Sequence, residues 1–326
     1  MLKRACISSG PDAAAFSSHL LAHLEGARPP APDWFERALE WAPERTQVQV
    51  EGAHIETLAW GRVGAPGILL LHGNAAHADW YSFIAPLLAS RFRVAAMSWS
   101  GMGGSDWRTP SQYSAALHAL EALTAARAAG LFESSERPVF VAHSFGTFPL
   151  IAAAATFGEQ LGGALLLDSP LRSPKTRQAE AGARAHRERR SPPTYASVTE
   201  ALARFRLIPP QPCEHLYLVD HIARTGLKPV GDRDAQRWSW RFDPDMFRSY
   251  DLGHPASDLA QARCRIGLVR GALSTVADAD NFAYARLVAP PGSVAREIPN
   301  ARHHVMLDEP VALAETIAEF SKGFLY

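Results

Sequence analysis

The sequence predicts an α/β fold in which helices flank a mostly parallel central sheet, and three observations support this prediction. Short continuous apolar runs recur along the chain, as expected for strands buried on both faces of a sheet. Stretches with helical character separate these runs, which indicates crossover connections between parallel strands. The third observation is a long segment, residues 171–251, which interrupts the alternation in the way that an insertion between two core strands would. The chain has 326 residues, of which 47% are hydrophobic, so it can form a large core.

The expected strands begin with a hairpin. Two segments with strand alternation, 46–50 and 54–60, are separated by the turn residues 51–53. The continuous apolar runs predict five further strands. We expect these at 67–71, 92–97, 139–142, 164–167 and 265–269.

The expected helices lie between these strands. Asp33 is a good N-cap for a helix that should run to about Trp41. Near the N-terminus, residues 13–25 predict one short helix with an apolar stripe. The remaining helices are expected at 80–90, 111–129, 145–157, 197–206 and 310–322.

These elements predict a division of the chain into three parts. Residues 1–42 form an N-terminal extension, of which we expect residues 1 to about 32 to be loosely attached, while 43–170 together with 252–326 form the α/β core. Residues 171–251 separate two core strands and predict an inserted helical cap. Ligands of open α/β sheets bind at the carboxyl edge of the strands, which such a cap would cover.

Composition excludes several classes of protein. Lys+Arg and Asp+Glu both total 33, and this balance argues against nucleic acid as a partner. The three cysteines (Cys6, Cys213 and Cys264) contain no CxxC, and the Cys213-Glu214-His215 run lacks further ligands, so neither a disulfide framework nor a metal site is expected. No apolar run approaches the ~18–20 residues of a membrane span, and the N-terminus shows no signal-peptide core. We expect a cytoplasmic protein without a cofactor; a homodimer is left open.

The strongest chemical signal is the segment AHSFG at 142–146. A strand leads directly into a tight turn at Ser144 and then into a helix. The small residues Ala142 and Gly146 would permit the strained turn that lifts a serine hydroxyl clear of the sheet. The N–H groups at the start of the helix would face a developing oxyanion. An ordinary serine in a strand-to-helix turn remains the alternative for this motif alone.

Three further segments accompany this motif in a fixed order: LHGN at 71–74, GMGGS at 101–105 and HHVMLDEP at 303–310. Together the four segments resemble the α/β-hydrolase fold family over about residues 46–326. The resemblance implies a serine-nucleophile member, because epoxide hydrolases and haloalkane dehalogenases of this fold carry aspartate at the turn. It also implies the α/β-hydrolase fold with a cap.

The resemblance implies a role for each matching residue. Ser144 corresponds to the nucleophile, and the backbone N–H groups of Phe145 and Asn74 correspond to the oxyanion hole. His303 corresponds to the catalytic base, from its spacing to the last helix. A histidine on a loop before an amphipathic helix can also reach over a sheet edge to take the serine proton. His304 is the rival, with a packed neighbour as its alternative role.

The catalytic acid departs from the family pattern. Ser274 stands where the aspartate after the penultimate strand is common. Some members place the acid after the preceding strand instead, where this chain has Asp168, and we choose that residue. Asp278 or Asp280 could also supply the carboxylate, or the acid could be absent. Asp168 could equally cap its loop.

Two features of the cap segment leave alternatives open. Residues 172–190 carry seven basic and two acidic residues, which could attract an anion or a membrane surface. We prefer the interpretation that they form a solvated stretch of a lid. The aromatics Trp238, Trp240 and Phe242 could line an acyl pocket or pin the cap to the body.

These observations predict a serine hydrolase of the carboxylesterase type that cleaves an ester-like bond of a small, mostly apolar substrate by a Ser-His-Asp mechanism. C–C bond hydrolysis, lactonase and thioesterase activity are alternatives on the same residues, and an acyltransferase is a weaker one. A non-catalytic member that binds a ligand or partner protein is an alternative of another class, motivated by Ser274.

Overall fold

The computed structural model describes residues 19–180, 193–232 and 235–325. Within these residues, eight strands form one sheet in the order β1-β2-β4-β3-β5-β6-β10-β11. The first two pairings are antiparallel, and all pairings from β4 to β11 are parallel. The mostly parallel sheet is therefore confirmed. Its strands are β1 (Glu44–Val50), β2 (Ala53–Trp60), β3 (Gly67–Leu71), β4 (Arg93–Met97), β5 (Val139–His143), β6 (Gly163–Leu167), β10 (Arg265–Gly271) and β11 (Val294–Ile298).

The edge strand β11 is the one core strand that the sequence did not predict. Four of its five residues are exposed, and its sequence mixes apolar with charged side chains. Strands such as β3, by contrast, are buried along their whole length. Because continuous apolar runs mark only strands covered on both faces, an edge strand with polar residues escapes this signal.

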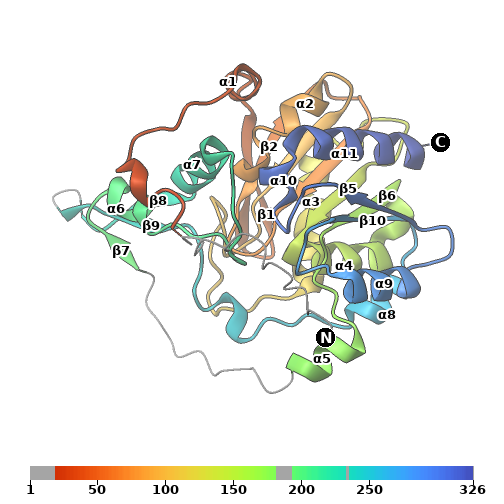
Figure 1. Ribbon diagram of the computed structural model, residues 1–326. Helices are drawn as coiled ribbons and strands as arrows, with labels where there is room; N and C mark the ends of the chain where they lie inside the picture. The colour runs from red at the N-terminus through yellow and green to blue at the C-terminus, as the bar shows by residue number, and fades with distance from the viewer. Residues whose placement is uncertain (1–18, 181–192, 233–234, 326) are drawn as a thin grey trace, which may run out of the picture.

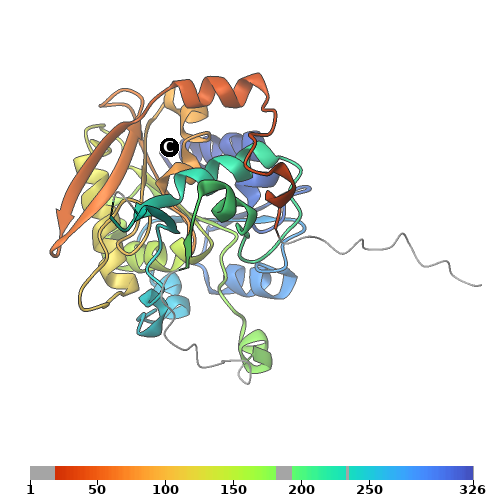
Figure 2. The same cartoon turned by 90° about the vertical axis from the view of Figure 1, so that its left-hand side faces the viewer.

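Helices cover both faces of the sheet (Figures 1 and 2). Alternate residues of β3 enter different cores: Ile68 packs in the cluster shared with α1, α2 and α11, while Leu69 packs in the cluster shared with α3, α4, α8 and α9. The helices of the first layer are α1 (Asp33–Glu40), α2 (Ala85–Ala89) and α11 (Pro310–Leu325), with the short α10 (Val305–Asp308) before the last. Those of the second are α3 (Ala115–Ala128), α4 (Thr147–Phe157), α8 (Pro255–Ala260) and α9 (Ala279–Val288).

Several helix boundaries differ from expectation for local reasons. The helix expected at 80–90 is a 3-10 turn, η2 (Ala78–Tyr81), followed by α2, which has a proline in its first turn. The helix expected from residue 111 begins at Ala115, because the Ser114 side chain caps it by accepting from the Leu117 N–H. Asp33 is the first residue of α1 rather than its N-cap.

The segment between β6 and β10 contains both helices and strands. The expected helical cap is corrected in one respect, because β7, β9 and β8 form a small antiparallel sheet there beside the helices. Trp240 on β9 packs against Tyr195 and Phe205 within this segment, which gives it a packing role. The elements are α5 (Pro174–Glu180), β7 (Thr194–Tyr195), α6 (Val198–Ala203), α7 (Leu216–Thr225), β8 (Leu227–Val230), β9 (Arg237–Trp240) and the 3-10 turn η6 (Met246–Arg248).

Residues 19–32 pack against the rest of the molecule, so this part of the extension is not loosely attached. Leu21 is 2% exposed. The Arg224 guanidinium of α7 donates to the Gly26 carbonyl at 2.7 Å. Of the helix expected at 13–25, residues 13–18 lie outside the described residues, and the remainder forms only the 3-10 turn η1 (Ala22–Leu24).

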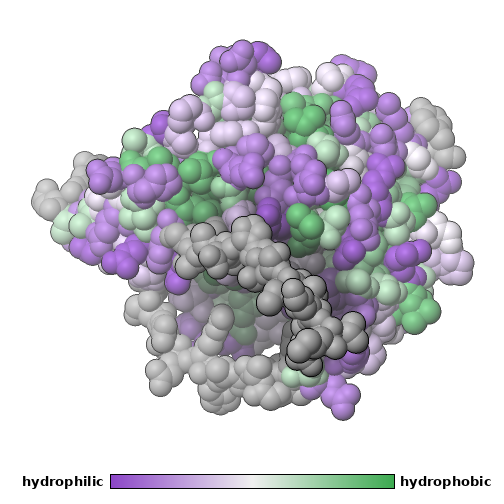
Figure 3. Space-filling model, in the orientation of Figure 1, coloured by the Kyte–Doolittle hydropathy of each residue, from purple (hydrophilic) through white to green (hydrophobic). Residues whose placement is uncertain are grey.

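The surface in Figure 3 carries hydrophilic residues over much of the visible face, with hydrophobic residues in separate patches among them. Among the described residues, none of the helices combines the length and the hydrophobicity needed to cross a bilayer.

Candidate active site

Ser144 sits in a strained turn between β5 and the 3-10 turn η3 (Ser144–Gly146), which leads into α4. Its φ of 52° lies in the left-handed region, which non-glycine residues rarely adopt. A Cβ added to Gly146 would lie 2.4 Å from the His72 carbonyl oxygen, and one added to Gly73 would lie 3.1 Å from the Ser144 Cβ. The tight turn expected at Ser144 therefore requires small residues at these two positions.

The register of the sheet places Ser144 and Asp168 side by side. His143, the last residue of β5, pairs with Leu167, the last residue of β6. Ser144 and Asp168 are the next residues along each chain, and both strands run in the same direction. Both side chains therefore start from the same carboxyl edge of the sheet, where ligands of such sheets bind.

Asp168 is fully buried, and its carboxylate accepts three hydrogen bonds. His303 Nδ1 donates to Oδ1 at 2.8 Å, and the Ser274 hydroxyl donates to the same oxygen at 2.6 Å. The Gly271 N–H donates to Oδ2 at 2.9 Å. A buried carboxylate needs such partners, and they fix its orientation toward the imidazole. The φ of Asp168 is also positive, at 48°.

The other two candidate acids have different partners. Asp278 caps α9 by accepting from the Asn281 N–H at 2.8 Å. Asp280 accepts from the Lys175 ammonium at 2.9 Å and is exposed. Asp168 is thus the candidate carboxylate whose contact with His303 the structure describes.

His303 lies on the loop between β11 and α10, and it is buried beside two other histidines. The ring centroids of His143 and His304 lie 4.8 and 4.9 Å from that of His303. His304 contacts the cap segment, because its Nε2 donates to the Pro209 carbonyl at 3.2 Å. Burial, and then the charge of neighbouring histidines, holds the pKa values of His143 and His304 well below the usual range.

The oxyanion-hole expectation concerns two backbone N–H groups, those of Asn74 and Phe145. Asn74 follows β3, whose Leu71 pairs with Ala142 of β5. In the part of the chain that the structure describes, no protein group accepts from the Asn74 N–H. The Phe145 N–H belongs to the first turn of a helical segment, where N–H groups lack intrahelical partners.

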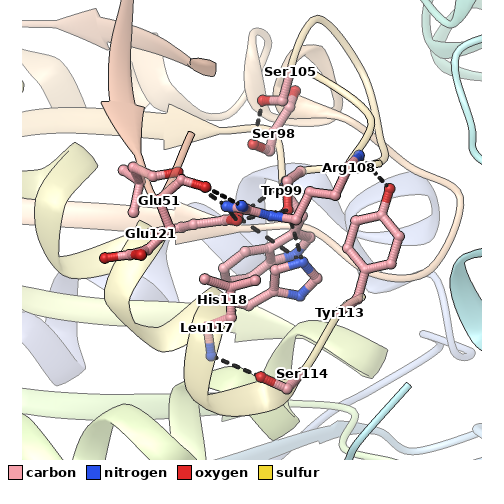
Figure 4. Close-up of polar contacts among 12 residues, drawn as sticks. Glu51, Ser98, Trp99, Ser105, Arg108, Tyr113, Ser114, Leu117, His118 and Glu121 are labelled. Atoms are coloured by element: carbon pink, nitrogen blue, oxygen red, sulfur yellow. Dashed lines mark hydrogen bonds and ion pairs between the residues drawn. The ribbon is translucent and has the colours of Figure 1, made fainter. Parts of the chain in front are cut away.

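A buried polar cluster supports this region from the side of α3 (Figure 4). Glu121 is fully buried, and its carboxylate accepts from Arg108 Nη2 at 2.7 Å, so the buried charge is paired. His118 stacks on Trp99 with centroids 5.1 Å apart, and Trp99 Nε1 donates to the His72 carbonyl at 2.9 Å. The cluster thereby braces the loop that leads to Asn74. Sequence reasoning did not single out these residues, because they look like ordinary loop and helix residues.

Aromatic side chains of the cap segment meet the residue after Ser144. Phe247 and Tyr250 both lie 5.1 Å from Phe145, measured between ring centroids. Phe242 in turn lies 6.2 Å from Phe247. Phe247 remains 37% exposed, so its ring presents apolar surface next to the turn. Of the three aromatics singled out in the sequence, Phe242 belongs to this group, whereas Trp240 packs inside the cap segment.

The basic stretch and the cysteines are the other features noted in the sequence. The basic stretch 172–190 lies partly outside the described residues; within them, Arg172 donates to the Val276 carbonyl at 2.9 Å. Cys213 contacts the Leu307 carbonyl at 3.8 Å, and burial raises the pKa of its thiol to about 12. Cys6 lies outside the described residues.

The fold and the motif order define a class of protein, and comparison with known families agrees. The profile of the "Alpha/beta hydrolase family" matches residues 68–316, more than half of the sequence. The chain belongs to the alpha/beta hydrolase family. No curated protein matches it.

Solved structures of hydrolases resemble the chain. An E-2-(acetamidomethylene)succinate hydrolase has a TM-score of 0.66 at 18% identity, covering 86% of this chain and 99% of that one. The thioesterase domain from the curacin biosynthetic pathway has a TM-score of 0.64 at 20% identity, covering 85% and 99%. A novel esterase from Mycobacterium tuberculosis has a TM-score of 0.63 at 23% identity, covering 95% and 100%. At these identities, the likeness shows the shared fold.

Proposed function

We propose that this hydrolase cleaves an ester bond of a small, mostly apolar substrate, with Ser144 as the nucleophile. The observation that carries the proposal is the 2.8 Å hydrogen bond between His303 Nδ1 and Asp168, beside the strained turn at Ser144. Because a carboxylate can only accept, Nδ1 carries the proton, and the Nε2 of a neutral His303 carries a lone pair. That lone pair is what a general base needs.

Each residue has one role in the proposed reaction. Ser144 Oγ attacks the ester carbonyl while His303 takes its proton, and a tetrahedral intermediate forms. The N–H groups of Phe145 and Asn74 donate to the oxyanion. His303 then protonates the leaving alcohol, which departs and leaves an acyl-enzyme. Water attacks the acyl-enzyme by the same route, and the acid and free serine are released.

Asp168 orients the imidazole and stabilises its protonated form. The hydrogen bonds that Ser274 and Gly271 donate to its carboxylate favour this role. A carboxylate with fixed partners holds the imidazole in one orientation. The alternative of a non-catalytic binding protein depends on the serine at position 274, where an acid is expected. Because Asp168 contacts His303, the serine at that position is a weaker argument for this alternative.

The apolar preference rests on the aromatic side chains near the turn. Phe145, Phe247 and Tyr250 contact one another, and Phe247 is only partly covered. Such a surface favours an acyl group with hydrocarbon character over a charged one. We therefore propose esters of short to medium acyl chains as substrates.

Fluorophosphonate labelling combined with hydrolysis of p-nitrophenyl esters tests the proposal. The wild type should label, and Ser144→Ala should not. His303→Ala and Asp168→Asn should lower the hydrolysis rate by on the order of 10³- to 10⁴-fold. Ser257→Ala, a change of an exposed serine, is the matched control and should label normally. A wild type that does not label, or labelling that persists in Ser144→Ala, would contradict the proposal.

A further inference from the structure

Three histidines from distant parts of the chain form one buried cluster. One ring nitrogen from each of His143, His303 and His304 lies within 4.8 Å of one from each of the others. Their side chains are almost fully buried, at 2%, 3% and 4% exposed. The proposed reaction uses only His303, so the cluster contains two imidazoles without a catalytic task.

The hydrogen bonds of the cluster leave one nitrogen of each neutral ring free. His143 Nε2 donates to the His303 carbonyl at 2.8 Å, and His304 Nε2 donates to the Pro209 carbonyl at 3.2 Å. His303 Nδ1 donates to Asp168. Because the acceptors are carbonyl or carboxylate oxygens, each bonded nitrogen carries the proton and the other nitrogen of the ring carries a lone pair.

The free nitrogen of His304 gives a second observation. His304 Nδ1 is buried and has no hydrogen-bond partner among the residues that the structure describes. An unpaired buried nitrogen costs free energy, which binding of an electron-pair acceptor would recover. A Cβ added to Gly73 would lie 3.0 Å from His143 Nδ1, so a glycine at position 73 avoids a tight contact with that nitrogen.

We propose that His143, His303 and His304 bind one zinc ion or a similar transition-metal dication, which inhibits the hydrolase by occupying the lone pair of His303. Three imidazole nitrogens with one open position form a common zinc coordination set. A metal-bound histidine typically donates its other N–H to a carboxylate or a backbone carbonyl, and all three rings already do so.

The cluster needs a modest rearrangement to bind the cation. Zinc–nitrogen bonds of about 2.0–2.1 Å place tetrahedral ligand nitrogens about 3.4 Å apart. The present separations reach 4.8 Å, so the rings must close by up to about 1.4 Å. The site is therefore not preformed, and we expect binding in the micromolar range rather than that of a structural zinc centre. Hard cations such as Mg²⁺ prefer oxygen ligands and should not bind there.

Titration calorimetry with zinc chloride on the whole chain tests the binding itself. The wild type should take up one equivalent, and His304→Asn should weaken binding at least 10-fold. His254→Asn, a change of an exposed histidine far along the sequence, is the matched control and should bind like the wild type. Zinc binding that is equal in wild type and His304→Asn would overturn the proposal, as would the absence of any binding.

The proposed inhibition by zinc rests on the proposed ester hydrolysis. The following test distinguishes failure of the inhibition from failure of the hydrolysis. Zinc should inhibit ester hydrolysis by the wild type, EDTA should restore the rate, and Mg²⁺ at the same concentration should leave it unchanged. Ser144→Ala should lose hydrolysis yet still bind one zinc ion. A chain that binds zinc but never hydrolyses esters would overturn the proposed function alone. An active chain that binds zinc at His304 without inhibition would overturn the inhibitory role.

Thermal unfolding without metal checks that the His304→Asn protein folds. If it does not, His143→Asn replaces it in the same titration, because this substitution removes a different nitrogen from the same site. Zinc binding unchanged in a folded His143→Asn protein would also overturn the proposal.

Discussion

The Ser274 hydroxyl donates a 2.6 Å hydrogen bond to Asp168 Oδ1, the same oxygen that accepts from His303. Ser274 occupies the loop after β10 where relatives of this fold commonly carry the acid, and Asp168 follows the neighbouring strand β6. The two loops thus place one carboxylate and one hydroxyl together, and the hydroxyl holds the carboxylate. Removal of the hydroxyl should slow the proposed reaction less than removal of the carboxylate.

Ser274→Ala removes one hydrogen bond to Asp168 and leaves the contact with His303 in place. We expect kcat/KM for p-nitrophenyl butyrate to fall by about 3- to 10-fold, as for loss of a supporting hydrogen bond of about 0.5–1.5 kcal/mol. Steady-state kinetics measure this change. A loss as large as that in Asp168→Asn would mean that Ser274 does more than support the carboxylate.

The proximity of the two side chains also predicts a rescue. Asp168→Asn combined with Ser274→Asp moves the carboxylate to the loop after β10, within reach of the space that Oδ1 now occupies. The double variant should hydrolyse esters at least 10-fold faster than Asp168→Asn alone. Ser274→Asp alone is the control, and it should be less stable because two buried carboxylates repel each other. A double variant no faster than Asp168→Asn would argue against exchange of the acid between these positions.

Gly146 has no space for a side chain. A Cβ at this position would lie 2.4 Å from a backbone oxygen, that of His72, which cannot move without the loop. Gly146→Ala should lower the free energy of unfolding in urea and abolish labelling of Ser144. The matched control is Gly323→Ala on α11, where an added Cβ would meet no atom of another described segment within 4 Å; it should raise stability by about 0.5–1 kcal/mol. A normal rate in Gly146→Ala would contradict the close packing of the turn.

Phe247 provides the test of the apolar preference. Its ring contacts Phe145, the residue after Ser144, and is partly exposed, so Phe247→Ala removes apolar surface next to the Phe145 ring. We expect kcat/KM to fall about 5- to 30-fold more for p-nitrophenyl hexanoate than for the acetate, which follows from about 1–2 kcal/mol of lost apolar contact. Leu287→Ala, at an 82% exposed position, should change neither rate. Equal losses for both esters would remove Phe247 from the acyl site.

Buried histidines predict that the protein loses stability in acid. Burial lowers the pKa of His72 to about 3 and that of His221 to about 4, whereas the unfolded chain has a histidine pKa near 6.5. The unfolded state therefore binds more protons below about pH 6.5, and the free energy of unfolding falls as the pH falls.

By about pH 5.5 these two groups together should lower the free energy of unfolding by about 3 kcal/mol relative to pH 7.5. His143 and His304 act in the same direction. Urea unfolding followed by tryptophan fluorescence at both pH values measures the change. His221→Gln should reduce the pH dependence by about one proton. Equal stability at the two pH values would contradict the lowered pKa values.

Features that depend on neighbours along the chain can be predicted from local sequence. The fully apolar strand β3 was predicted with its observed bounds, since burial on both faces selects a continuous apolar run. The turn at Ser144 was predicted because a strained φ needs small residues two positions away, and these are adjacent in sequence. The three short strands of the cap segment escaped prediction, because they span only two to four residues, too few for an alternating pattern to indicate a strand.

Contacts across the sheet edge, by contrast, arise from the assembled fold. The sequence offered Asp168, Asp278 and Asp280 for contact with His303, and the pairing of His143 with Leu167 places Asp168 beside Ser144. The fold also brings the side chains of His143 and His304 close together, although the two residues are distant along the chain. Such contacts depend on strand order and register, which arise from the packing of the whole core, and no local pattern of residues encodes them.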